Sequence, residues 1–127
     1  SVIADLGCGN GRNGKWIKKR GFCNIFEFDL ADDAPNKIDL GCEKIPSCKG
    51  SCNLILCNYV MCFLNDEERV FLSKEIKRIA DKDCYLILEL FPAKNGFEYD
   101  TDKILSLFGG WKVINKVKDR FIIRKVR

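Results

Sequence analysis

A turn with four glycines connects a short apolar run near the start of the chain to a segment with helical character. The stretch VIADLGCGNGRNGKW covers residues 2–16 and holds two overlapping glycine patterns. Read from Gly7 it is Gly-x-Gly-x-Gly, with Asp5 two positions upstream, and read from Gly9 it is Gly-x-Gly-x-x-Gly. Glycines in such a turn let the backbone bend sharply and let a ligand approach it. The sequence therefore predicts a strand, a ligand-binding turn and a helix, in this order.

The length and composition are those of one globular domain. With 127 residues, 46% of them apolar and 31% charged, the chain is long enough for a single hydrophobic core. It has no run of 18 apolar residues and no signal-peptide pattern, so we expect no contact with a membrane and an intracellular compartment, cytoplasmic or nuclear. We expect one domain over residues 1–127. Because Ser1 already lies in a strand-like run, we also expect an upstream segment that belongs to this domain.

Hydrophobic periodicity predicts strands that alternate with helices. The run NLILCN at 53–58 is nearly continuous, as in a strand buried on both faces. Asn65 is a predicted helix cap, because acids follow it directly and bases come later in the same segment. The predicted elements are strands at 2–6, 24–29, 36–40, 53–58 and 84–90, helices at 13–20, 66–80 and 100–109, and a terminal hairpin with strands at 111–117 and 120–126.

This order of elements predicts an α/β fold with a mainly parallel sheet. The last two strands are joined too tightly to be parallel, so the sheet is expected to end in an antiparallel hairpin. The connections ADDAP (31–35) and GCEKIPSCKGS (41–51) leave no room for full helices. We therefore expect a compact version of the fold with shortened helices. Leu72, Ile76 and Ile79 form the predicted buried stripe of the helix at 66–80, and Trp16 and Ile17 lie on one side of the first helix.

The acids near the glycine turn distinguish between two classes of ligand. Asp29 follows Gly9 by twenty residues, the spacing at which a carboxylate binds ribose hydroxyls, and it suits a nicotinamide dinucleotide or S-adenosylmethionine equally. Asp5 favours the second ligand, because a carboxylate at the end of the first strand repels a pyrophosphate but attracts a sulfonium and an amino group. A dehydrogenase also needs a substrate domain, for which no residues remain.

The motifs along the chain resemble, in their order, those of the class I (Rossmann-like) S-adenosylmethionine-dependent methyltransferases. VIADLGCGNG resembles the first motif, FEFDL the second and IDLGCEKIP the third. CNLILCNYVMCFL resembles the fourth, with Asn53 where the family has Asp, and RIADKDCYLILEL resembles the segment leading into the next strand. The resemblance implies a seven-stranded Rossmann-like sheet and S-adenosyl-L-methionine as cofactor, with Asp29 at the ribose and Asp39 and Leu40 beside the adenine. The implied cofactor-binding residues are Asp5, Gly7, Cys8, Gly9, Gly11, Asp29, Leu30, Asp39, Leu40 and Asn58.

The predicted activity is methyl transfer to an acceptor that the motifs do not identify. Strand ends supply Asn58, Tyr59 and Glu89 as candidate catalytic groups, with Asn95 in a later loop, and the chain has no His to act as a base. The alternative prediction is a non-catalytic S-adenosylmethionine-binding or structural module that acts through a partner protein. A partner protein or the upstream segment would then complete the acceptor site.

Two basic segments place RNA slightly ahead of a protein or a small molecule as the acceptor. Five basic residues and no acid lie within residues 12–20, and seven basic residues and one acid lie within residues 111–127. The two segments need not form one surface. The expected position of the methyl group, at the carboxyl ends of the strands, instead has the acids Asp32, Asp33 and Asp66 nearby.

We predict that the eight cysteines are free thiols that bind no metal. Cys57, Cys62 and Cys84 lie inside apolar runs, as reduced buried cysteines do, and three more fall between residues 42 and 52. The chain has no Cys-x-x-Cys pair, so a zinc site lacks its usual ligands. Elemental analysis of the purified protein tests this prediction, and stoichiometric zinc would overturn it.

Overall fold

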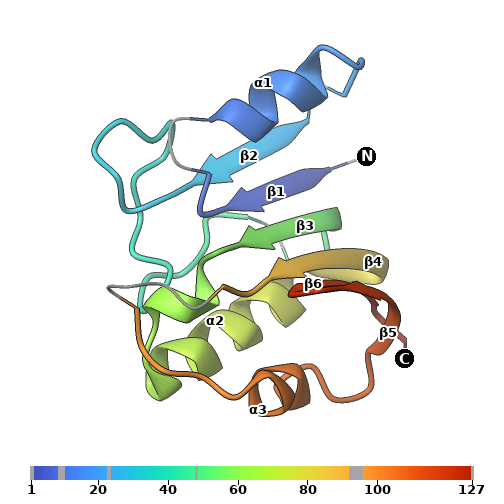
Figure 1. Cartoon of the computed structure of the whole chain (residues 1–127). Coiled ribbons are helices and arrows are strands. Elements are labelled where there is room, and N and C mark those ends of the chain that lie inside the picture. The colour runs from blue at the N-terminus through green and yellow to red at the C-terminus, as the bar shows by residue number, and fades with distance from the viewer. Residues whose placement is uncertain (1, 9–10, 23, 48, 92–95, 127) are drawn as a thin grey trace.

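Four parallel strands form the body of the sheet, and an antiparallel hairpin extends it at one edge. The computed structural model describes the chain except for residues 1, 9–10, 23, 48, 92–95 and 127. Within this part the strand order is β2-β1-β3-β4-β6-β5, and the carboxyl ends of the parallel strands meet at one edge, at the left of Figure 1. The strands are β1 (Ile3–Leu6), β2 (Ile25–Phe28), β3 (Cys52–Asn58), β4 (Ala80–Glu89), β5 (Lys112–Val117) and β6 (Arg120–Arg124).

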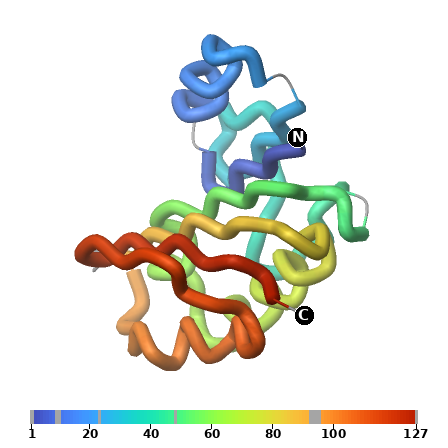
Figure 2. Tube along the Cα trace, turned by 90° about the vertical axis from the view of Figure 1, so that its right-hand side faces the viewer, coloured from blue at the N-terminus to red at the C-terminus, as the bar shows by residue number. Residues whose placement is uncertain are grey.

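The helices are short, as predicted, except for one. They are α1 (Arg12–Lys18), the 3-10 turn η1 (Met61–Phe63), α2 (Asp66–Ile79) and α3 (Thr101–Ser106). No helix among the described residues is long and apolar enough to cross a bilayer. In Figure 2 the blue α1 and the red and orange terminal hairpin lie at opposite ends of the sheet.

The described sheet has six strands, so the prediction of seven is wrong. The segment 36–40, predicted as a strand, makes only one isolated parallel bridge, between Asp29 and Lys37. The reason is the connection before it, because a parallel crossover needs a dozen or more residues and only seven separate these two positions. The strand predicted at 84–90 also begins earlier, at Ala80, directly after the last residue of α2.

One face of the sheet is fully covered. Side chains of β3, β4 and β6 that point to this face, such as Ile55, Leu86 and Ile123, pack in one core with α2 and α3, which lie against the sheet in Figure 1. The predicted stripe of α2 is confirmed, because Leu72, Ile76 and Ile79 are completely buried. These three and the rest of the buried core exclude water from most of the sheet.

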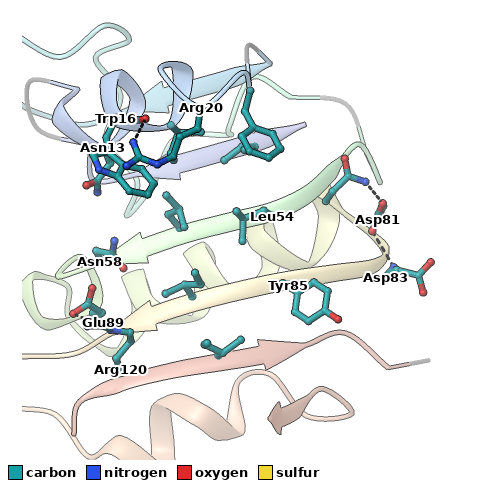
Figure 3. A pocket seen from close by; sticks show the side chains of 17 residues that line it. Asn13, Trp16, Arg20, Leu54, Asn58, Asp81, Asp83, Tyr85, Glu89 and Arg120 are labelled. Atoms are coloured by element: carbon teal, nitrogen blue, oxygen red, sulfur yellow. Dashed lines mark hydrogen bonds and ion pairs between the residues drawn. The ribbon is translucent and has the colours of Figure 1, made fainter. Parts of the chain in front are cut away.

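Among the described residues, α1 is the one helix on the other face, so the prediction that residues 53–58 are buried on both faces is wrong in part: Leu56 is buried, but Leu54 is only half-buried. Leu54 of β3 and Tyr85 and Ile87 of β4 line an open groove of about 1130 Å³ beside α1 (Figure 3). The side chain of Trp16 lies at the border of this groove, half-exposed, with the Arg20 guanidinium stacked on its ring at 3.4 Å. The helices α2 and α3 on one face and the short helix α1 on the other explain this asymmetry.

Helix α2 begins at the predicted cap. The Asn65 side chain accepts a hydrogen bond from the Glu68 backbone N–H, and the Glu68 carboxylate accepts one from the Asn65 N–H. This reciprocal pair satisfies two donors that a helix start leaves free. The acids in its first turn also face the positive end of the helix dipole.

The same helix holds the long connection between β2 and β3. The Glu75 carboxylate accepts a hydrogen bond from the Ile45 N–H at 2.7 Å and is paired with Arg78 at 2.8 Å. Arg78 in turn donates to the carbonyl oxygens of Ile45 and Ser47, at 2.7 and 2.9 Å. Ile45 itself is completely buried. A segment without a helix of its own is therefore fixed by backbone hydrogen bonds to side chains of α2.

Replacing the buried Glu75 should destabilise the protein, in a way that depends on pH. Its hydrogen bonds with Arg78 lower the Glu75 pKa below the ordinary value of 4.5. A lowered pKa adds stability that is complete above that value and is lost as the pH falls below it. We expect Glu75→Gln to lower the free energy of unfolding by about 1–2 kcal/mol at pH 7, and by less at pH 4. Urea unfolding measures both values, with the exposed Glu67→Gln as control; equal losses at the two pH values would contradict the ion pair's role.

Candidate cofactor site at the carboxyl edge

The glycine turn after β1 is fixed to the end of β2. The backbone N–H groups of Gly7 and Cys8 both donate to the Phe28 carbonyl oxygen, at 2.8 and 3.2 Å. Gly7 and Gly11 have φ values of +79° and +90°, which L side chains rarely adopt. Gly9, a predicted site residue, lies outside the described residues.

Two features of the turn exclude larger residues. A Cβ atom on Gly7 would lie 2.3 Å from Cγ2 of Val60, in the turn that follows β3. A Cβ atom on Gly11 would lie 2.7 Å from an oxygen of the Glu27 carboxylate. The glycine turn is therefore in close contact with the chain after β3 on one side and with a carboxylate of β2 on the other.

Three carboxylates gather beneath this turn. Asp5 of β1 and Glu27 of β2 are register partners on neighbouring parallel strands, so their side chains point to the same face of the sheet. Asp29 follows two residues after Glu27 and has the same alternation. Asp5 is 1% exposed, and Glu27 is also buried, with Nζ of Lys18 at 3.5 Å from one of its oxygens.

Burial and neighbouring negative charges make Asp5 a weaker acid than an exposed aspartate. Desolvation, followed by the negative charges of Glu27 and Asp29, raises the pKa of Asp5 from 3.8 to about 6. The same surroundings raise the pKa of the Cys8 thiol to about 12, with burial as the largest cause. The Cys8 thiol is therefore protonated at neutral pH, and the Cys8 backbone N–H donates to the Phe28 carbonyl oxygen.

Four buried acceptor atoms have no hydrogen-bond partner within the described residues. They are both carboxylate oxygens of Asp5, Oε2 of Glu27 and the side-chain oxygen Oδ1 of Asn58. Buried acceptors without a donor are unfavourable, so a set of them indicates a ligand that supplies donors. The negative charge of the set favours a cationic ligand, and the amino group of S-adenosylmethionine offers N–H donors with a positive charge.

Glu27 is a candidate site residue that the sequence motifs did not indicate. Within FEFDL, the resemblance to the family's second motif implied a role for Asp29 alone. The signal for Glu27 was the alternation of acids, Glu27 and Asp29, at a spacing of two in a strand that pairs with β1. Once the register is known, Glu27 lies beside Asp5 and beneath the glycines.

The residues predicted to bind ribose and adenine follow β2. The Asp29 backbone accepts from Ile38 and donates to Asn36, and its carboxylate accepts from the Ala31 N–H at 3.1 Å. Leu30 is exposed beside it. Asp29 thus lies next to the Phe28 carbonyl that anchors the glycine turn, and its role at the ribose stays a prediction.

The structure uses Asp39 and Leu40 partly for the fold itself. One Asp39 oxygen accepts from the Gly41 N–H at 3.0 Å, and the Leu40 side chain is buried in the core. The backbone of this segment is connected to Asp29 through the hydrogen bond from Ile38. A role of Asp39 and Leu40 at the adenine remains a prediction.

Asn58, Tyr59 and Glu89 lie together at the carboxyl ends of β3 and β4. Asn58 and Glu89 are register partners, and the Tyr59 hydroxyl donates to Oε2 of Glu89 at 2.9 Å. Nε of Arg120 lies 3.8 Å from the same oxygen. The hydrogen bond to Glu89 raises the pKa of the Tyr59 hydroxyl, so it stays protonated. Asn95 lies outside the described residues.

The groove beside α1 and the candidate cofactor site share Asn58 but are otherwise separate. Figure 3 shows Asn58 and Glu89 at the carboxyl end of the groove, with Asp81 and Asp83 at its far end. Most of the groove lining is apolar and belongs to the middle of the strands. The unpartnered carboxylates, which point to a cationic ligand, instead lie beneath the glycine turn.

The described cysteines take no part in this site beyond the Cys8 backbone. Cys8, Cys42, Cys52, Cys57, Cys62 and Cys84 form no disulfides. Among the described residues no group of three or more metal-ligating side chains is placed to bind a metal ion. Cys23 and Cys48 lie outside the described residues.

A parallel sheet with a glycine turn over buried carboxylates defines a Rossmann-like cofactor-binding protein of class I. The family described as methyltransferase domain matches residues 4–88, more than half of the chain. The chain belongs to this family of S-adenosylmethionine-dependent methyltransferases, and S-adenosylmethionine is its cofactor. No curated protein sequence matches the chain.

Solved structures share the fold at low sequence identity. A TehB-like SAM-dependent methyltransferase from Corynebacterium glutamicum has a TM-score of 0.76 and 22% identity, over 100% of this chain and 80% of that one. A SAM-dependent methyltransferase from Archaeoglobus fulgidus has a TM-score of 0.71 and 15% identity, over 87% and 61%. The 1,6-didemethyltoxoflavin-N1-methyltransferase of Burkholderia thailandensis, solved with its substrate and S-adenosylhomocysteine, has a TM-score of 0.80 and 12% identity, over 99% and 71%. The chain is thus shorter than each of these proteins, and matches only 61% of the second.

Neutralising Asp5 should stabilise the free protein and weaken cofactor binding. The raised pKa means that the folded state binds a proton more readily than the unfolded state between pH 3.8 and about 6, so this carboxylate opposes folding above pH 6. We expect Asp5→Asn to raise the free energy of unfolding at pH 7.5 by about 1–3 kcal/mol, an advantage that disappears by pH 4. The affinity of the parent protein for S-adenosylmethionine should fall as the pH drops through 6, and that of Asp5→Asn should be low and nearly constant. Calorimetry and urea unfolding across this range test both, with the exposed Asp33→Asn as control; an unchanged affinity in Asp5→Asn would contradict the assignment.

Proposed function

We propose that this chain transfers a methyl group from S-adenosylmethionine to an acceptor that binds over the carboxyl ends of β3 and β4. The observation that carries the proposal is the set of unpartnered acceptor atoms of Asp5, Glu27 and Asn58 beneath the glycine turn. When bound, the cofactor supplies an activated methyl group, whose bond to sulfur breaks with its electron pair moving to sulfur as the acceptor forms the new bond. The protein's main task in such a displacement is to orient two molecules.

The residues present fit the parts of this cofactor. Asp5, Glu27 and Asn58 offer acceptors for the amino group, and Asp29 offers a carboxylate for the ribose hydroxyls. Gly7 lets the turn pack directly against Val60, because Val60 fills the space that a Cβ atom would take. The exposed Leu30 and the segment with Asp39 and Leu40 form the remaining edge, where the family resemblance implies the adenine.

On the acceptor side the chain provides positioning groups. Oε2 of Glu89 accepts a hydrogen bond from the Tyr59 hydroxyl and lies 3.8 Å from Nε of Arg120, so this oxygen already has two partners. An acceptor that loses a proton is therefore expected to give it to water at this exposed edge. Tyr59 and Glu89 are better understood as groups that shape the acceptor position than as an acid and a base.

The arrangement of charge bears on RNA as acceptor. The basic segments lie in α1 and in the terminal hairpin, which are separated by β1, β3 and β4 in the sheet. Between them, the carboxyl edge carries the acids Asp29, Glu89 and Asp66, and Arg120 of the hairpin lies beside Glu89. The groups that follow β3 and β4 therefore bear most directly on which acceptor we propose.

Asp29→Ala should weaken cofactor binding by about 1–3 kcal/mol, because it leaves ribose hydroxyls without a partner. Isothermal titration with S-adenosylmethionine, S-adenosylhomocysteine and NAD measures this and separates the ligand classes. The control is Asp33→Ala, an exposed acid four residues later. Parent-like affinity in Asp29→Ala would remove this residue from the site.

Binding and activity need separate tests. A transfer assay with a labelled methyl group, run over RNA, protein and metabolite fractions, detects the acceptor. Binding of S-adenosylmethionine without transfer to any fraction would favour the non-catalytic module, and binding of NAD alone would overturn the proposal.

A further inference from the structure

Four half-exposed aromatic side chains lie in segments that follow β3 and β4. Tyr59 and Phe63 come after β3, Phe91 comes two residues after β4, and Phe97 lies further along. Their exposed fractions are between 48% and 54%. We call these four residues the aromatic rim. Large apolar side chains gathered on a surface are typical of binding sites.

The segments of the rim are tied to one another. The rings of Tyr59 and Phe91 meet edge to face, with centroids 5.8 Å apart. The Phe97 N–H donates to the Cys62 carbonyl oxygen at 2.9 Å, next to Phe63. Aromatic residues from three separate stretches of chain are therefore brought to one end of the sheet.

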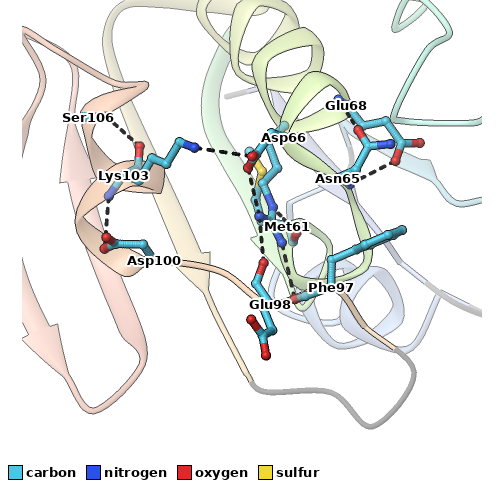
Figure 4. A network of polar contacts seen from close by, with 10 residues as sticks. Met61, Asn65, Asp66, Glu68, Phe97, Glu98, Asp100, Lys103 and Ser106 are labelled. Carbon is cyan, nitrogen blue, oxygen red and sulfur yellow. Dashed lines mark hydrogen bonds and ion pairs between the residues drawn. The ribbon is translucent and has the colours of Figure 1, made fainter.

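A buried arginine fixes the backbone beneath the rim. Nε of Arg69 donates to the Met61 carbonyl oxygen at 2.8 Å, and its other nitrogens donate to those of Glu98 and Phe97, at 3.2 and 3.5 Å. Figure 4 shows these contacts, with the Phe97 side chain pointing away from them. A guanidinium used for three backbone carbonyls makes the rim a pre-organised surface.

Tyr59 connects the rim to the cofactor turn. Its φ of +60° is unusual for a bulky residue, and such conformations are concentrated at functional sites. Two hydrogen bonds to Glu89 hold it, one from its N–H to the Glu89 carbonyl and one from its hydroxyl to the carboxylate. The next residue, Val60, touches Gly7. The rim therefore adjoins the glycine turn.

The charges near the rim do not suit a polyanion. Arg69 is buried and bonded to carbonyls, Arg120 lies near Glu89, and Lys103 is paired with Asp66 at 3.3 Å. Each cation described here thus faces an acid or a carbonyl. Phosphate binding needs several cations that are free to exchange counterions, and these three already contact acids or carbonyls.

We infer that the aromatic rim binds a small, planar, uncharged aromatic acceptor and presents a ring nitrogen or hydroxyl oxygen to the methyl group. This inference rests on the proposed function and names its substrate class. Flat rings stack on or pack edge to face against Tyr59 and Phe91, and the Tyr59 hydroxyl oxygen offers a hydrogen bond to an N–H or O–H of the acceptor. The acceptor atom gains the methyl carbon, the sulfonium becomes a neutral thioether, and the acceptor's proton passes to water.

The test measures binding of aromatic probes to the protein saturated with S-adenosylhomocysteine. The probes are 2-naphthol, 7-hydroxycoumarin and 4-hydroxyquinoline, with cyclohexanol as a non-aromatic comparison, and saturation-transfer NMR gives affinity without turnover. We expect the aromatic probes to bind and cyclohexanol to bind at least 5-fold more weakly. Phe91→Ala should weaken the aromatic probes at least 5-fold, and Phe97→Ala should also weaken them.

Two comparisons make the result specific. Phe26 of β2, 44% exposed at the far edge of the sheet, gives the control variant Phe26→Ala, which should bind the probes like the parent. Phe91→Leu keeps an apolar side chain without a ring and should weaken binding as well. Calorimetry with S-adenosylmethionine on every variant shows whether the cofactor site is intact.

The outcomes separate the inference from the proposed function. Probe affinity unchanged in Phe91→Ala, or equal for cyclohexanol and 2-naphthol, overturns the aromatic acceptor while cofactor binding stands. An RNA oligonucleotide that is methylated equally by the parent and Phe91→Ala, with affinity falling steeply with salt, also overturns it in favour of RNA. Failure of the parent protein to bind S-adenosylmethionine overturns the proposed function itself.

Discussion

The packing of α2 against the sheet is the interaction on which the remaining parts of this small domain depend. Its apolar stripe buries the middle of β3 and β4, and its charged side chains reach the loops on either side. Glu75 and Arg78 hold the connection before β3, Arg69 holds the turn after it, and Lys77 donates to the carbonyl oxygen of Leu107 beyond α3. A single helix thus satisfies backbone groups that separate helices would otherwise cover, which is how the fold persists with such short connections.

The carboxylates beneath the glycine turn oppose stability where they support function. Asp5 and Glu27 are placed side by side by the strand register, in a buried position and with unpartnered oxygens. The free protein gains no stability from the Asp5 carboxylate, because burial and the neighbouring negative charges disfavour its charged form. The arrangement becomes favourable when a cationic ligand with N–H donors binds. The unpartnered carboxylate oxygens therefore select for a ligand of this kind.

Features with a local signal could be predicted from the sequence. The apolar runs of β1, β3 and β4, the cap at Asn65 and the terminal hairpin each depend on residues close in the chain, and all appear in the structure. The prediction of a strand at 36–40 was wrong, because strand pairing there depends on the length of the connection before it. Glu27 was missed because its place beside Asp5 follows from the strand register. The rim was missed because it joins residues after β3 to residues after β4, which are distant in the chain. The open face beside Trp16 likewise depends on which helices are present, which periodicity within one strand does not reveal.

The central position of β1 has a consequence for the order of folding. β1 lies between β2 and β3, so the glycine turn gains its neighbours, the Phe28 carbonyl and Val60, only after pairing with both strands. The contact with Val60 spans more than fifty residues, whereas β5 and β6 are joined through Lys118 and Asp119 alone. Closing a long loop costs more chain entropy than closing a hairpin, and it is therefore slower. During synthesis the cofactor turn therefore leaves the ribosome early but acquires its shape late, after the chain as far as β3 has emerged.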